Sequence, residues 1–201
     1  MLATDGEPGL GEALAGVANR AQRCRWHLVD QLKYSLYQDG VKAPGQREPT
    51  QELAGLLAID VPAAEFEQVQ PEEKTALAQQ IQQARTQVVD LIRRLRQQQD
   101  EKAAGYLETA RTRMFRWLEF WLETGLVTPA TTGYLERLMR ELGRRLKKIG
   151  FGWTDAGAEQ MARILLRRIT DPTEWAEYWK KRLRLDGKVQ IRFHSVKTVQ
   201  P

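Results

Sequence analysis

The chain has 201 residues, of which 42% are hydrophobic, and a formal net charge of +5. This composition supports a packed core and excludes a globally disordered chain, and the single cysteine excludes an intrachain disulfide. No apolar run approaches the ~20 residues that span a bilayer, so we expect a cytoplasmic protein with no secretory leader and no membrane partner.

The charge is distributed unevenly along the chain. Residues 1–100 contain 11 Lys/Arg and 14 Asp/Glu, whereas residues 101–201 contain 20 and 12. A basic half that follows an acidic half favours a polyanion such as DNA as the partner of the second half. Solvated helix faces would give the same imbalance, and on charge alone both interpretations stay open.

Strands and helices are both predicted in the first 40 residues. Residues 2–5 are predicted to form a short apolar strand that ends at Asp5. Apolar residues then recur at helical spacing between positions 10 and 17, which predicts a helix. Residues 21–27 favour a second short strand, and the helix that follows ends at Asp39-Gly40. The order strand, helix, strand, helix indicates an α/β fragment.

Residues 41–130 are predicted to be helical. Prolines interrupt residues 41–71, where we expect loops and one short helix. Residues 72–104 lack Pro and Gly and carry an apolar stripe at three- and four-residue steps, which is typical of a packing face. With a second helix over residues 107–123 that stops at Gly125, this pattern predicts an antiparallel hairpin over 72–124 that could also support a homodimer.

Three further helices are predicted towards the C-terminus. Residues 134–149 are amphipathic and very basic, and Thr154 or Asp155 opens a helix that runs to residue 169. The segment Asp171-Pro172-Thr173-Glu174 caps a helix that ends near residue 185, and residues 188–194 alternate as in a short strand. The predicted fold class is mostly α, with a small α/β part of one or two short strands.

Two carboxylates are candidates for metal chemistry. Asp5 follows a strand and precedes a glycine turn, a common place for a metal ligand in α/β sheets, although Asp-Gly is also a common turn. Glu136 lies in the first turn of the basic helix, where the helix dipole stabilises an acid in any case. The cations that follow it could bind phosphates beside a carboxylate, or could simply form a solvated face: Arg137, Arg140, Arg144, Arg145, Lys147 and Lys148.

Cys24 and His27 are three residues apart and together supply half of a zinc site. With one cysteine and two histidines in the chain, a tetrahedral Cys/His site cannot be completed. On a strand the two side chains would point to opposite faces, which disfavours a nucleophile and its base. We therefore expect a structural pair with Trp26 packed beside it.

Trp117 and Trp121 lie four residues apart on one helix face. Core packing is the usual role of such a pair. Stacking on DNA bases is the functional alternative.

Taken together, these motifs resemble the Mutator-like group of DDE transposases. Asp5-Gly6 matches that family's second catalytic Asp, Cys24 and His27 match its Cys-x-x-His, and Glu136 matches its catalytic Glu at the start of a basic helix. The segment 152–162 is similar to a Trp-Ser-x-x-Gly-Ala-(Asp/Glu) block of one insertion-sequence branch. The resemblance implies that residues 1–40 are part of a ribonuclease-H-like core, 41–130 a helical insertion, 131–185 the Glu-bearing helix and C-terminal helices, and 186–201 a tail.

The resemblance also implies an activity, namely DNA cleavage and strand transfer dependent on Mg²⁺ or Mn²⁺. Asp5 and Glu136 would be the metal ligands, DNA the partner, and the nucleoid the location. The family's first catalytic Asp has no counterpart here, so we expect weak metal binding and no strand cleavage by this chain alone. The alternatives are a non-enzymatic helical DNA-binding or oligomerisation module and a helical interaction protein.

Overall fold

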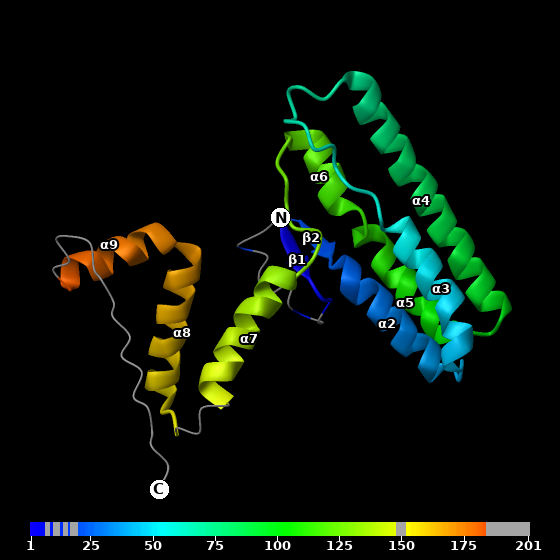
Figure 1. Cartoon of the computed structure of the whole chain (residues 1–201). Coiled ribbons are helices and arrows are strands. Elements are labelled where there is room, and N and C mark those ends of the chain that lie inside the picture. Colours follow the sequence, from blue (N-terminus) through cyan, green and yellow to red (C-terminus); the bar gives the residue numbers. More distant parts are fainter. Residues whose placement is uncertain (7–8, 10–12, 14–15, 17–19, 148–151, 184–201) are drawn as a thin grey trace, which may run out of the picture. The chain divides into compact units, whose positions relative to one another are not determined.

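The computed structural model confirms a mostly helical chain with a small sheet (Figure 1). It divides into two compact units, here called the N-terminal unit (Met1–Tyr134) and the C-terminal unit (Leu135–Pro201). The residues that the structure describes are 1–6, 9, 13, 16, 20–147 and 152–183.

The sheet consists of two short parallel strands, β1 (Leu2–Thr4) and β2 (Ala21–Arg23). Leu2 is paired with Ala21 and Thr4 with Arg23, so the two strands end level with one another. Parallel strands need a crossover connection. The helix predicted for that crossover lies largely outside the described residues.

Helix α2 (Arg25–Gln38) follows β2 with only Cys24 between them. The prediction that the second strand extends to His27 is therefore wrong, because the helix begins two residues earlier. Gly40 ends the segment as expected: its φ is +88°, and the Val41 N–H donates to the Leu36 carbonyl over 3.0 Å.

Helix α3 (Ala43–Leu56) occupies much of the region that was predicted to be looped. Pro44 lies in its first turn, where a missing N–H is tolerated. The helix continues through Pro49 because tertiary contacts override the local signal. Leu53 is fully buried, and the Gln46 side chain donates to the Val41 carbonyl over 2.6 Å.

The predicted hairpin is present, but its second arm is broken. Helix α4 (Pro71–Gln97) starts at a capping box made by Gln70 and Glu73. Its end is marked by Gln99, whose φ is +67°, rather than by glycine. The Asp39 carboxylate then accepts from the first turn of the next helix, at the N–H groups of Lys102 and Ala103. The second arm comprises α5 (Glu101–Ala110), the 3₁₀ helix η1 (Arg111–Arg113) and α6 (Arg116–Thr124).

A hydrophobic core joins the helices of the N-terminal unit, which lie side by side in Figure 1. The apolar stripe of α4 is buried in this core as predicted. Since the stripe is covered by α3, α5 and α6, it offers no apolar surface to a second copy of the chain. A homodimer through the hairpin would have to use its polar faces.

The C-terminal unit continues helix α7 (Gly133–Lys147) and adds α8 (Asp155–Thr170) and α9 (Pro172–Arg182). The predicted caps of α8 and α9 are confirmed. Thr154 Oγ1 accepts from the Gly157 N–H over 3.2 Å, and Asp171 Oδ1 accepts from the Glu174 N–H over 2.9 Å. The predicted strand over 188–194 lies outside the described residues.

Candidate functional site

The carboxyl ends of β1 and β2 form one edge, and the predicted site residues of the N-terminal unit follow it. Thr4 is paired with Arg23, and the Cys24 N–H donates to the Thr4 carbonyl over 2.8 Å. Asp5 and Cys24 are therefore the first residues beyond two neighbouring strands. In parallel sheets this edge is where ligands bind.

The turn after Asp5 depends on glycine. Gly6 has a φ of +96°, and a Cβ atom there would overlap the Arg23 guanidinium, which lies directly against it. Arg23 is held by Tyr106, whose hydroxyl accepts from Nη2 over 3.1 Å and whose ring centroid lies 5.7 Å from Arg23 Cζ. The exposed residue Asp5 thus directly precedes a glycine that lies against the Arg23 guanidinium.

Tyr106 is partly buried and packs against the hydrophobic core. Burial raises the pKa of its phenol, and the hydrogen bond from Arg23 only partly opposes this rise. The phenol therefore stays protonated at neutral pH and acts as a structural contact of Arg23.

Cys24, His27 and Thr132 come together at the start of α2. The thiol accepts from the Thr132 N–H over 3.3 Å and from Thr132 Oγ1 over 3.4 Å. Thr132 Oγ1 also lies 3.4 Å from His27 Nδ1. Because His27 stands on the first turn of a helix rather than on a strand, its ring and the thiol face the same hydroxyl, and the expectation of opposite faces is wrong.

The Cys24 thiol is buried, with 1% of the residue exposed. Burial raises its pKa, but hydrogen bonds from Thr132 and His27 outweigh this and hold the pKa below its ordinary value. A lowered pKa favours the thiolate, whereas the lack of exposure keeps soluble reagents away from it. The contacts with Thr132 give the thiol a structural role: it anchors the segment that precedes α7.

This contact brings the chain back to the sheet edge after a helical excursion, the segment that runs from α2 to α6. Thr132 is 108 residues beyond Cys24, and the Arg25 N–H donates to the Ala130 carbonyl over 3.0 Å. Helix α7 then begins at Gly133, still within the N-terminal unit. The two ends of the excursion therefore meet at the edge that Asp5 and Cys24 mark.

Two anchors of this edge were missed from the sequence. Gln22 is fully buried: its amide donates to the Met114 carbonyl over 2.8 Å and its oxygen accepts from the Trp117 N–H over 3.1 Å. Arg25 donates to the carbonyls of Leu57 and Ile59, each over 3.2 Å. These contacts join residues that are distant in sequence, so no local pattern of residues signals them.

The tryptophans predicted as candidates for base stacking are core residues instead. Trp117 is 4% exposed and Trp121 1%. Arg25 Cζ lies 5.2 Å from the Trp117 ring centroid, and the Phe66 ring packs edge-on at 5.1 Å from that of Trp121. The prediction that these indoles contact DNA is wrong, since protein atoms cover them.

Glu136 and the predicted phosphate-binding cations lie in the C-terminal unit. Glu136 occupies the first turn of α7 and is exposed. Arg137, Arg140, Arg144 and Lys147 are also exposed, Arg145 is half-buried, and Lys148 lies outside the described residues. Arg144 donates to Glu141 over 3.1 Å, the ion pair described within α7.

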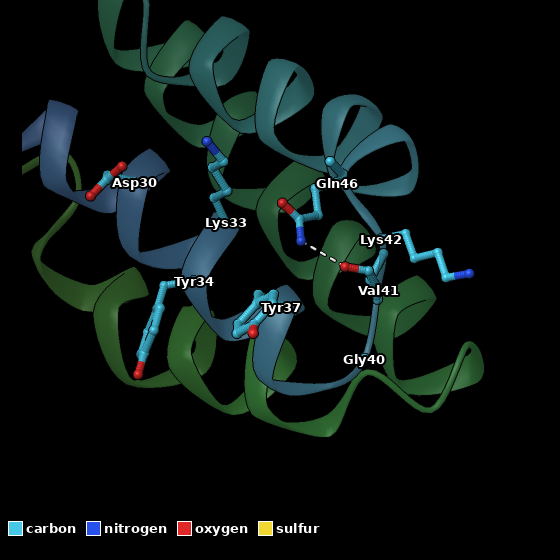
Figure 2. Close-up of a pocket in the computed structure, with 9 residues that line it drawn as sticks. Asp30, Lys33, Tyr34, Tyr37, Gly40, Val41, Lys42 and Gln46 are labelled. Atoms are coloured by element: carbon cyan, nitrogen blue, oxygen red, sulfur yellow. Dashed lines mark hydrogen bonds between the residues drawn. The ribbon is translucent and has the colours of Figure 1, made fainter.

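A groove of about 590 Å³ lies elsewhere in the N-terminal unit, at the turn between α2 and α3 (Figure 2). Tyr34, Tyr37 and Lys33 line it from α2, and Lys42 lines it from the turn. Asp30 is also part of its lining, so its charge is mixed. Figure 2 shows the Gln46 amide directed at the Val41 carbonyl, the bond that holds this turn.

The divalent metal that the sequence resemblance implies prefers oxygen ligands. Asp5 and Glu136 offer carboxylates of that kind, whereas Cys24 and His27 are softer donors that suit zinc. The latter two supply only half of the four ligands of a structural zinc site. A magnesium role therefore concerns the carboxylates alone.

The chain matches no protein-family model, no curated protein and no solved structure. None of the described helices is both long enough and apolar enough to cross a membrane.

Proposed function

We propose that this chain acts in DNA transposition, as part of a metal-dependent catalytic domain of the DDE type. The observation that carries the proposal is the return of the chain to one sheet edge. Asp5 follows β1, Cys24 follows β2, a helical excursion intervenes, and Thr132 comes back to Cys24 one residue before α7. This is the chain order that the resemblance to Mutator-like transposases implies.

In this proposal Asp5 and Glu136 are the oxygen ligands of Mg²⁺ or Mn²⁺. A bound divalent cation would stabilise the negative charge that develops on the phosphate oxygens during strand cleavage. Asp5 precedes the Gly6 turn, against which the Arg23 guanidinium lies. The exposed cations of α7 would hold the DNA backbone through its phosphates.

A non-enzymatic DNA-binding module is the second candidate. The cationic face of α7 favours it, because Arg137, Arg140 and Arg144 are exposed irrespective of any role of Asp5. The two candidates share a DNA partner and differ in whether the carboxylates bind a metal. A DNA-bound role at the nucleoid would fit either one.

Two binding measurements on the full chain test the proposal. Mn²⁺ binding, followed by electron paramagnetic resonance, should weaken at least tenfold in Asp5→Asn and in Glu136→Gln. The affinity for a fluorescein-labelled DNA duplex should fall at least tenfold in Arg140→Gln/Arg144→Gln. Arg163→Gln/Arg168→Gln in α8 removes the same charge and serves as the matched control.

The outcomes separate the candidates. If Mn²⁺ binds equally well to all three proteins while the α7 variant loses DNA affinity, the DNA-binding module replaces the metal-dependent proposal. If the wild-type chain does not bind DNA even in 50 mM salt, both candidates are refuted.

A further inference from the structure

A second groove of the N-terminal unit, of about 390 Å³, lies between α4 and the segment from η1 to the start of α6. Three arginines line it: Arg85 from α4, Arg111 from η1 and Arg116 from α6. The other polar residues of its lining are Gln82, Thr86 and Thr112, and none of the lining residues is acidic. The groove is therefore a cationic concavity with hydroxyl and amide groups on its walls.

The cations of this groove are held in position by neighbours. Arg85 is paired with Glu119. Arg111 Nε donates to Glu108 Oε1 over 2.6 Å, and Arg116 Nε donates to the Thr112 carbonyl over 3.1 Å. A guanidinium has five N–H donors, so each side chain keeps donors available after these bonds. Fixed donors bind an anion at a lower entropic cost than freely rotating ones.

Buried apolar side chains form the bottom of the groove. Val88, Met114 and Phe115 line it and are at most 1% exposed. Arg113, exposed in the same 3₁₀ turn, brings the number of arginines between positions 111 and 116 to three. Glu108 and Glu119 are the carboxylates paired with these arginines, so the cluster of Arg85, Arg111, Arg113 and Arg116 carries excess positive charge.

This excess contrasts with the rest of the unit. Residues 1–134 contain 15 Lys/Arg and 18 Asp/Glu, so a local group of cations is not a consequence of the composition. The groove between α2 and α3 has two lysines in its lining, but Asp30 is also part of that lining. An anionic partner is therefore favoured at the α4 groove and not at the α2 groove.

We propose that the groove between α4 and η1 binds phosphates of the DNA backbone, as a contact surface separate from α7. The identity of the partner rests on the proposed function. Arginine suits this role because its planar fork makes paired hydrogen bonds to phosphate oxygens. The hydroxyl of Thr112 can donate to the same oxygens, whereas that of Thr86 donates to the Gln82 carbonyl. Phosphate contacts of this kind position DNA and carry no sequence information.

The test measures the affinity of the full chain for a labelled 30-base-pair duplex by fluorescence anisotropy between 50 and 200 mM KCl. In Arg111→Gln/Arg113→Gln/Arg116→Gln we expect at least tenfold weaker binding in 50 mM salt. The slope of log affinity against log salt should fall by about 2–3, because each lost phosphate contact contributes about 0.9.

Two further variants keep the result interpretable. Lys33→Gln/Lys42→Gln/Arg93→Gln removes three exposed positive charges from the same unit and should stay within about threefold of the wild type. The three arginines changed to lysine keep the charge and should restore at least half of the lost slope. Circular dichroism and the fluorescence of buried Trp117 and Trp121 establish that each variant is folded.

Each outcome has a distinct meaning. If the groove variant and the Lys33→Gln/Lys42→Gln/Arg93→Gln variant lose affinity equally, binding follows overall charge and the inference is overturned. If the groove variant binds normally while Arg140→Gln/Arg144→Gln does not, the inference fails and the role proposed for α7 stands. If only the groove variant loses affinity, the inference stands and α7 is not the DNA contact.

Discussion

The two units of this chain bury their apolar residues to very different degrees. In the N-terminal unit the helices share one core, and side chains such as Leu32, Leu53 and Leu107 are fully covered. Among the described residues of the C-terminal unit, Leu138 and Leu165 are the buried apolar ones, whereas Met139 and Ile164 are about half exposed. Hydrophobic burial therefore accounts for the stability of the N-terminal unit and contributes far less to the stability of the C-terminal unit.

Local interactions contribute a larger share of the stabilising free energy in the C-terminal unit. Its helices begin at Thr154 and Asp171, whose side chains accept from backbone N–H groups, and Arg163 pairs with Glu159 one turn away. Such contacts contribute roughly 0.3–1.5 kcal/mol each. Residues 135–201 also hold 16 Lys/Arg against eight Asp/Glu, so charge is concentrated where the core is smallest. One unit is organised by packing, and the other by caps and charge.

The largest expected effect comes from truncating the core of the N-terminal unit. Leu32→Ala should lower the free energy of unfolding by about 2–5 kcal/mol, because it leaves a cavity at a fully buried position. Ile164→Ala in α8 is the matched control and should change it by less than about 0.5 kcal/mol. Urea unfolding followed by circular dichroism measures both. Equal losses in the two variants would remove the contrast between the units.

A smaller effect is expected from the buried polar anchor of the same unit. Gln22→Leu keeps the approximate size of the side chain but leaves the Met114 carbonyl and the Trp117 N–H without their partner. The expected loss is about 1–3 kcal/mol. Gln79→Leu, at an exposed position of α4, should be nearly neutral. A neutral Gln22→Leu in the same urea titration would mean that packing alone holds β2 to α6.

The smallest effect is a pH dependence that arises at Cys24. Because the pKa of the folded thiol lies below its unfolded value of about 9.0, the unfolded state holds the proton to higher pH. The free energy of unfolding should therefore rise with pH through the window below about 9, and this gain should vanish as pH falls through the folded pKa.

Cys24→Ser does not titrate in this range and serves as the reference for that measurement. The difference between wild type and Cys24→Ser should grow from pH 6 to pH 9 in parallel urea titrations. Thr132→Val removes a hydrogen bond that lowers the pKa, so it should reduce the growth of this difference. A difference that is constant with pH would contradict the lowered pKa.

Helix ends with a strong local cause could be predicted from the sequence. Gly125 takes a φ of +73° and ends α6, and Asp171 caps α9, both as expected from their residue types. The stripe of α4 was predictable because its period matches the helix over seven buried positions. In each case the information lies within a few residues of the feature.

Features that depend on distant partners could not be predicted. The break at Gln99 has no glycine to mark it, and Asp39, which follows α2, caps the start of α5. Helix α3 passes through Pro49 because its buried face finds partners on α2 and α4. At the candidate site, Asp5 and Cys24 were identified from their types, but Thr132 was not, since its role comes from a contact 108 residues away.

The closure between Cys24 and Thr132 has a consequence for how this protein can vary. Because the chain leaves the sheet edge and returns to it at adjoining points, the helices between them form a closed excursion. Loop-closure entropy grows only slowly with the number of residues enclosed. Extra residues in the loops between these helices should therefore be tolerated, provided that the helices keep the contacts of Gln22, Arg23 and Arg25 that hold the sheet edge, whereas exchange of the whole excursion would remove those contacts.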